Sequence, residues 1–337
     1  MTQEARVQEF VAAFERLRAE VEKVIVGHRD IINHVLIGMF AGGHVLLEGA
    51  PGLGKTLLIK TLAEGLELSF SRIQFTPDLM PADIIGTNII LEDAEGRKHF
   101  QFQPGPIFGH ILLADEINRA TPKTQSALLE GMQEGSVTVA GASRPLPAPF
   151  FVLATQNPIE MEGTYPLPEA QLDRFLFKLR VRYPAIEELN AIIDRTTQVR
   201  PVRVERVMSG SNVLAFRELI REVPIADHVR ALASTIIMAT HPMWEHSPES
   251  ARRFIRYGAS PRGAQALVLG AKVRALTQGR FNVSVDDLRA LAAPALRHRI
   301  ILNFEGEAEG VDTDTLVGQV VERAEAVTVQ GKEAFVR

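Results

Sequence analysis

The chain has 337 residues, of which 46% are hydrophobic and 23% are charged. These proportions are typical of a folded globular protein and exclude an intrinsically disordered chain. Lysine and arginine total 37 against 41 aspartates and glutamates, so the formal net charge of -4 argues against a broad basic surface for nucleic acid. Cysteine is absent, which excludes disulfide scaffolds, zinc-thiolate sites and cysteine nucleophiles.

The sequence carries no targeting or membrane signal that we recognise. Its first residues are polar and charged, without the apolar stretch of a signal peptide. The densest apolar runs, residues 35–41 and 150–154, are far shorter than the ~18 residues needed to cross a bilayer. We therefore expect a soluble, cytoplasmic protein without a membrane span.

The first half of the chain has the pattern of an α/β protein. Apolar side chains recur every three or four residues between positions 6 and 24, which predicts an amphipathic helix. From residue 44 onward, short apolar runs alternate with helical patterns, and this alternation predicts a parallel sheet with helical crossovers. The expected strands are residues 44–48, 69–75, 111–114, 150–155 and 175–179.

Two hairpins and a change of pattern complete the expected organisation. The hairpins are predicted to pair residues 87–92 with 98–102 and residues 136–139 with 144–146. After Tyr183-Pro184 the strand signals stop, so we divide the chain into an α/β core of residues 1–183 and a helical lid of residues 184–337. Within the lid, Ser260-Pro261 predicts the start of a helix, and Ser284 with Asp287 predicts a capping box.

A phosphate-binding loop is predicted directly after the first strand. The pattern GxxxxGK[ST] lies between that strand and a helix beginning at Leu57, which is the context that the mechanism requires. Backbone N–H groups of such a loop and the helix N-terminus can surround an anion. The expected nucleotide-binding residues are Gly49, Ala50, Pro51, Gly52, Leu53, Gly54, Lys55, Thr56 and Leu57. Lys55 would reach the β and γ phosphates, and Thr56 would place its hydroxyl on Mg²⁺.

A pair of acidic residues follows the third predicted strand. Asp115 and Glu116 end a buried apolar run, where a charge is expensive to bury without a partner. Successive strand residues point to opposite sides, so Asp115 can face Mg²⁺ while Glu116 faces the attacking water. The alternative is that both residues simply begin a solvated loop.

Two further polar residues are candidates for the same site. Asn157 follows the strand at residues 150–155 and so lies at the carboxyl edge of the sheet, where ligands of open α/β sheets gather. It could hold the attacking water, or form an ordinary Asn-Pro turn. Arg174 could stabilise phosphoryl-transfer charge, or be a surface arginine, and sequence alone leaves both interpretations open.

Together these residues resemble an AAA+ ATPase, and more narrowly a MoxR-family ATPase. The resemblance covers most of the chain and rests on long segments as well as on the phosphate loop. These segments are residues 115–120 (DEINRA), 122–125 (PKTQ), 128–130 (LLE), 132–134 (MQE), 154–158 (ATQNP) and 162–175 (EGTYPLPEAQLDRF).

The resemblance implies a five-stranded AAA+ core with a helical lid, in which the hairpin at 87–102 is the helix-2 insert. It also implies ATP hydrolysis at the interfaces of a hexameric ring, with Arg174 as the arginine finger and Arg262 as sensor 2. Val26-Gly27 matches the adenine-side linker of the family. Whether Arg262 acts on its own or a neighbour's nucleotide stays open, and without the family Arg262 would be an ordinary first-turn residue whose charge opposes the helix dipole.

The family resemblance further implies a chaperone that matures or activates protein partners, often proteins with a von Willebrand factor A domain. The alternatives on the same scaffold are a metal-chelatase motor subunit and a nucleic-acid motor, and the net charge argues mildly against DNA. A switch GTPase is excluded because the chain has no Asn-Lys-x-Asp motif.

Overall fold

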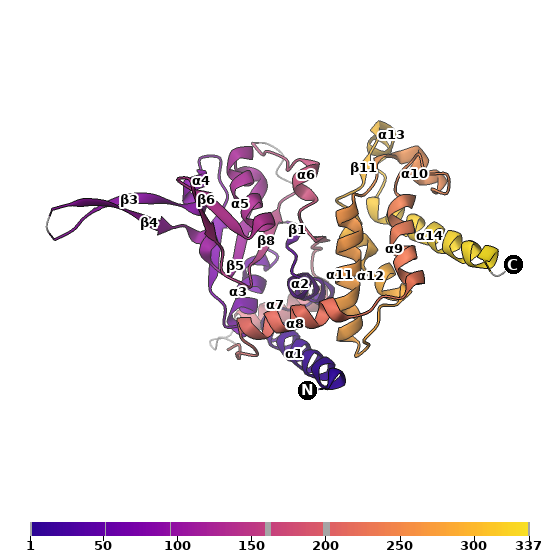
Figure 1. Cartoon of the computed structure of the whole chain (residues 1–337), viewed down its shortest axis with the longest axis horizontal. Coiled ribbons are helices and arrows are strands. Elements are labelled where there is room, and N and C mark those ends of the chain that lie inside the picture. The colour runs from indigo at the N-terminus through magenta and orange to yellow at the C-terminus, as the bar shows by residue number, and fades with distance from the viewer. Residues whose placement is uncertain (1, 51, 95, 159–162, 198–202, 336–337) are drawn as a thin grey trace.

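A parallel five-stranded sheet forms the centre of the first lobe (Figure 1). The structure is a computed structural model that describes residues 2–50, 52–94, 96–158, 163–197 and 203–335. The strand order β2-β5-β8-β1-β9 places β8 between β1 and β5. The predicted α/β fold is confirmed, with the strands β1 (Val45–Glu48), β2 (Phe70–Gln74), β5 (Ile111–Asp115), β8 (Phe151–Gln156) and β9 (Phe177–Arg180).

The sheet is buried on both faces, as expected of parallel strands whose crossovers are helices. Along β1, Val45 and Leu47 belong to the larger apolar core, whereas Leu46 belongs to a second core on the opposite face. The core helices are α1 (Gln3–Val24), α2 (Arg29–Phe40), α3 (Lys55–Gly65), α4 (Pro81–Ile85), α5 (Pro122–Glu134) and α6 (Glu169–Leu172), with 3-10 turns η1 (Pro106–Phe108) and η2 (Ile117–Arg119).

Both predicted hairpins are present. They are β3 (Gly86–Glu92) with β4 (Lys98–Pro104), and β6 (Ser136–Val139) with β7 (Ala142–Pro145). The β3–β4 hairpin extends far from the body of the first lobe (Figure 1). Gly86 at its base has φ +86°, and a Cβ there would lie 2.2 Å from the backbone oxygen of Gln103, so glycine is required for this close crossing.

The second lobe is helical, with one addition that the sequence did not indicate. Ile255–Tyr257 (β10) pairs antiparallel with Ile301–Leu302 (β11). The expected caps are formed, since the Ser260 hydroxyl accepts from the Arg262 N–H and Ser284 forms a capping box with Asp287. Of the helices that follow β9, α7 (Ile186–Thr196) and α8 (Gly210–Glu222) lie beneath the first lobe, against α1 and α2 (Figure 1). The helices of the second lobe are α9 (Asp227–Ala239), α10 (Glu249–Phe254), α11 (Pro261–Thr277), α12 (Val285–Leu296), α13 (Phe304–Ala308) and α14 (Thr313–Phe335).

Within the described ranges, every helix is too short or too polar to cross a membrane.

A buried histidine joins the sheet to α5. His44 precedes β1; its Nδ1 accepts from the Val152 N–H and its Nε2 donates to the Met132 carbonyl oxygen, both at 3.0 Å. These two bonds require the neutral imidazole. Burial lowers the pKa of His44 to about 4.

This histidine predicts a loss of stability in acid. Between pH 6.5 and 4 the His44 imidazole binds a proton in the unfolded chain, where its pKa is ~6.5, but not in the folded protein. The free energy of unfolding therefore falls as the pH drops through this range. His44→Gln should lower the slope of this fall by up to ~1.4 kcal/mol per pH unit, measured by urea denaturation at several pH values. The exposed control His99→Gln should keep the wild-type slope, and an unchanged slope in His44→Gln would contradict the assignment.

Candidate active site

The phosphate loop connects the carboxyl end of β1 to the first turn of α3, which contains Thr56 and Leu57. Gly52 and Gly54 have φ values of +81° and +75°, and a Cβ built on either meets no atom of the described chain within 4 Å. The loop therefore leaves open space beside backbone amides, as an anion site requires. Of the other loop residues, Ala50 is buried, Leu53 is half-buried, and Pro51 lies outside the described residues.

Gly49 is required for a different reason. A Cβ at Gly49 would lie 2.9 Å from both the backbone oxygen and the Cβ of Val181. The start of the loop is thus packed against the chain that leaves β9.

The side chain of Lys55 folds back onto the phosphate loop that precedes it. Its Nζ donates to the carbonyl oxygen of Gly49 at 2.7 Å. Burial lowers the pKa of the ammonium group, and the charges of Asp115 and Glu116 partly oppose this shift. The loop therefore holds a partly desolvated cation, which favours the binding of an anion.

The two acidic residues lie at the same edge of the sheet. Asp115 is the last residue of β5, and Glu116 has the left-handed φ of +55°, so the backbone turns sharply between the strand and η2. Both residues are fixed by Thr155 of β8, which is fully buried. The Thr155 hydroxyl donates to Asp115 Oδ1 at 2.6 Å and accepts from the Glu116 N–H at 2.9 Å. This threonine was not predicted as a site residue, although it lies in segment 154–158.

One further oxygen of each acid has a partner that was not predicted either. Arg72 Nη2 donates to Asp115 Oδ2 at 2.7 Å. Gln74 Nε2 and Arg119 Nη1 donate to Glu116 Oε2 at 2.8 Å and 3.0 Å. The only sequence signal for Arg72 and Gln74 is that they alternate with the apolar Ile73 in the predicted strand at residues 69–75.

Asn157 lies beside the phosphate loop. It follows β8, whose last residue Gln156 accepts a hydrogen bond from the Gly49 N–H at 3.2 Å. Asn157 is buried, with 6% of the residue exposed. The structure therefore brings together the loop, Lys55, the acid pair and Asn157 at the carboxyl edge.

The residues at this edge fit a magnesium-bound phosphate. Thr56 and Asp115 provide a hydroxyl and a carboxylate, and Mg²⁺ is commonly bound by one or two such oxygens together with phosphates and water. The described part of the chain has no group of three or more His, Asp or Glu side chains that could hold a metal alone. A metal here would thus depend on the phosphates for further ligands.

Val26 and Gly27 connect α1 to α2 on the side of α7. Gly27 has φ +69°, and a Cβ there would lie 2.3 Å from Glu188 Oε1, so the linker packs closely against this carboxylate. Glu188 also lines a neighbouring cavity of ≈ 510 Å³, which reaches Arg180 at the end of β9. This volume is within the ~300–1,000 Å³ range of small-molecule sites.

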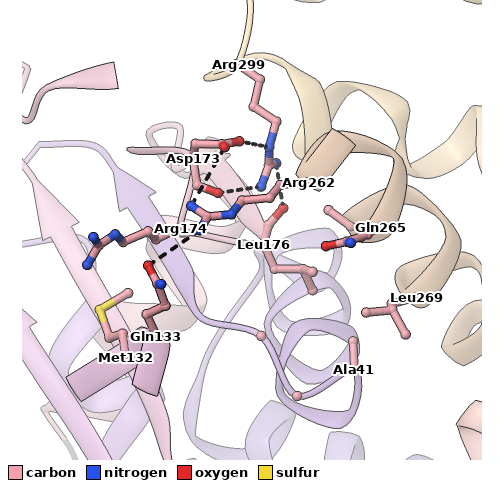
Figure 2. Close-up of a pocket in the computed structure, with 13 residues that line it drawn as sticks. Ala41, Met132, Gln133, Asp173, Arg174, Leu176, Arg262, Gln265, Leu269 and Arg299 are labelled. Atoms are coloured by element: carbon pink, nitrogen blue, oxygen red, sulfur yellow. Dashed lines mark hydrogen bonds and ion pairs between the residues drawn. The ribbon is translucent and has the colours of Figure 1, made fainter. Parts of the chain in front are cut away.

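Arg174 and Arg262 lie together at the opposite edge of the sheet, beside a cavity of ≈ 200 Å³ (Figure 2). Arg174 Nη1 donates to the Leu129 carbonyl oxygen of α5 at 2.7 Å. Arg262, in the first turn of α11, donates to Gln133 Oε1 at 3.4 Å and lies 3.9 Å from Asp173 Oδ2.

Asp173 connects the core to the lid at this cavity. Its carboxylate accepts from Arg299 Nε at 2.8 Å and from the Ser260 hydroxyl at 2.9 Å, and both donors belong to the second lobe. The Arg299 side chain is only 3% exposed. The carboxylate therefore offsets the charges of Arg262 and Arg299. Of the two arginines of the predicted site, Arg174 belongs to the first lobe and Arg262 to the second.

The two edges are separated by the length of β1. Val45 pairs with Phe177, so Arg174 lies just before the amino ends of the two strands, whereas the phosphate loop follows Glu48 at the carboxyl end. Four strand residues span about 13 Å. Neither arginine is placed to reach the phosphate loop of its own chain.

Comparison with known proteins gives matches over both lobes. Residues 44–177 match the family "ATPase family associated with various cellular activities (AAA)", and residues 249–320 match "AAA lid domain". Chaperone MoxR1 of Mycobacterium tuberculosis is 41% identical over 93% of this chain and 82% of its own length. Protein MoxR of Methylorubrum extorquens is 32% identical over 89% of this chain and 90% of its own. The chain belongs to the MoxR family of AAA+ ATPases.

A solved structure matches both lobes of this chain. The crystal structure of a putative ATPase from Cytophaga hutchinsonii matches with a TM-score of 0.88 and 41% identity, over 95% of this chain and 96% of that one. The fold of both lobes is thus common to the two proteins.

The contacts of Thr155 predict how this MoxR-family site responds to mutation. Thr155→Val keeps the side-chain shape but leaves the Glu116 amide and Asp115 Oδ1 without their buried partner, at a cost of about 1–3 kcal/mol. Thr155→Ser retains the hydroxyl and should lose clearly less stability. Urea denaturation of both variants measures the difference, and equal losses would show that the hydroxyl does not hold the acids.

Proposed function

We propose that this protein hydrolyses ATP with Mg²⁺ as a hexameric ring, with each nucleotide bound between two subunits. One observation carries this proposal. The phosphate loop and the acid pair lie at one edge of the sheet, whereas Arg174 and Arg262 lie at the other. A ring with heterologous contacts joins unlike surfaces of neighbouring subunits, so it can place the arginines of one chain at the phosphates of the next.

The chain's own loop residues bind the nucleotide in this proposal. The backbone N–H groups of Gly52, Leu53 and Gly54 surround the phosphates, and Lys55 contacts the β and γ phosphates. Thr56 and Asp115 hold the metal. When bound, Mg²⁺ neutralises charge on the β and γ phosphates. Val26, Gly27 and Leu57 border the remainder of the nucleotide.

Glu116 and Asn157 act on the attacking water. Glu116 orients and polarises the water, which requires its carboxylate to leave the contacts with Gln74 and Arg119. Asn157 holds the same water or contacts the γ phosphate from the neighbouring strand end.

Arg174 and Arg262 serve the nucleotide of the neighbour. Their guanidinium groups stabilise charge on the γ phosphoryl group as it is transferred, an effect worth ~10³–10⁵ in rate for arginine fingers. This assigns Arg262 to the neighbour's nucleotide, because it lies beside Arg174 and interacts with Gln133 and Asp173. An anion beside Arg262 also removes its unfavourable interaction with the helix dipole.

Hydrolysis in this ring drives the remodelling of a protein client. The relative from Mycobacterium tuberculosis is named a chaperone, which supports this role. Von Willebrand factor A domain proteins are the client class that we propose, from the family resemblance alone.

Two substitutions separate binding from hydrolysis. Lys55→Ala should weaken ATP binding by at least about tenfold, because it removes a cation from the phosphates. Glu116→Gln should bind ATP as the wild type does and reduce turnover by at least ~100-fold, because it removes only the base. Calorimetry and phosphate release measure the two effects, and equal loss of binding in both variants would contradict the assigned roles.

A mixing experiment tests the shared site. Arg174→Ala and Lys55→Ala are each inactive alone, but in a random 1:1 ring roughly a quarter of the interfaces join an intact phosphate loop to an intact arginine. We expect the mixture to recover a comparable fraction of wild-type phosphate release. The control mixes Arg174→Ala with the double variant Lys55→Ala/Arg174→Ala, which supplies no arginine and should stay inactive. No recovery in the first mixture, with mixed rings verified by mass spectrometry, would contradict the shared site.

A further inference from the structure

Two side chains of β2 cover the acid pair. Arg72 and Gln74 are two residues apart in one strand, so they point to the same side of the sheet. Arg72 Nη2 donates both to Asp115 Oδ2 at 2.7 Å and to Gln74 Oε1 at 2.8 Å. Gln74 in turn donates to Glu116 Oε2 at 2.8 Å. A continuous chain of hydrogen bonds thus links the two carboxylates.

Arg72 is the positive partner of the carboxylate that is assigned to the metal. The Asp115 side chain is only 14% exposed, and a carboxylate in such a position needs a nearby positive charge. The Arg72 side chain is 47% exposed, so its guanidinium can move into solvent when another cation arrives. Its charge would repel a magnesium ion bound to the same carboxylate.

We propose that Arg72 is a built-in competitor of magnesium. It pairs with Asp115 in the metal-free protein and must leave when the metal-bound nucleotide enters, whereas Gln74 holds Glu116 only until that carboxylate turns to the attacking water. This inference deepens the proposed function and rests on it. Arg72 is therefore a positioning residue whose ion pair weakens metal-dependent nucleotide binding.

The β2 position also connects the competitor to the long hairpin. Phe75 follows Gln74 and donates its N–H to the Asp115 carbonyl oxygen at 2.9 Å. The chain then passes through α4 directly into β3. A short segment of chain therefore joins the hairpin to the strand that holds Arg72 and Gln74.

The test measures the affinity gain that the metal provides, without hydrolysis. Binding of a fluorescent ADP analogue to the full chain is measured with Mg²⁺ and with EDTA, and the ratio of the two dissociation constants is the metal gain. Arg72→Gln should raise this gain about fivefold, the upper range for an exposed ion pair, and leave the EDTA value within about twofold. Arg72→Lys retains the charge and should stay near the wild-type gain.

Two controls make the result specific. Arg206→Gln removes an arginine that pairs with Glu67, a residue shortly before β2 and away from the acids. This variant should change neither the Mg²⁺ nor the EDTA dissociation constant. In an Asp115→Asn background, Arg72→Gln should have no effect, because the competition needs the carboxylate.

An unchanged or reduced gain in Arg72→Gln would overturn the competitor role while leaving the proposed function intact, and so would an increase that persists without Asp115. If the wild type shows no metal gain and Asp115→Asn changes nothing, the magnesium assignment of the proposed function fails together with the inference.

Discussion

The parallel pairing of β1 with β9 determines where the charged groups of the candidate site can lie. Because the two strands run in the same direction, the residues before β9 lie at the amino ends of the strands. The residues after β1 lie at the carboxyl ends, on the opposite side of the sheet. The phosphate loop follows β1, and Arg174 precedes β9. Because both faces of the sheet are packed in apolar cores, this separation cannot be closed by bending the sheet. In our proposal, a complete set of charges around one triphosphate therefore needs two chains.

The contacts between the two lobes lie at the same end of the sheet as Arg174. Asp173 immediately precedes Arg174, and it binds Arg299 and Ser260 of the lid. The lid is thus fixed to the core at the arginine edge. His44 joins strand and helix at the same edge, because it connects β8 to the Met132 carbonyl oxygen near the end of α5. The same helix accepts a hydrogen bond from Arg174. In our proposal, a change at one nucleotide would reach the next site through these contacts.

Local patterns in the sequence predicted most of the fold and the placement of the phosphate loop and acids. Strand and helix periods are local properties, and the carboxyl ends of parallel strands meet at one edge whatever the details of packing. The β10–β11 pair was not predicted, since its partners Ile255 and Leu302 are far apart in sequence and each strand is very short. The division at residues 183 and 184 stays a prediction. Thr155, Arg72 and Gln74 were missed because their roles depend on the register between neighbouring strands, which no single segment encodes.

The central claim is most directly tested by the structure of the Glu116→Gln protein assembled with ATP and Mg²⁺. This substitution removes the proposed base and leaves every phosphate contact in place, so the nucleotide should remain intact. The account predicts that the γ phosphate contacts Lys55 of one subunit together with Arg174 and Arg262 of its neighbour. A γ phosphate whose protein contacts all come from a single chain, or that meets neither arginine, would contradict it.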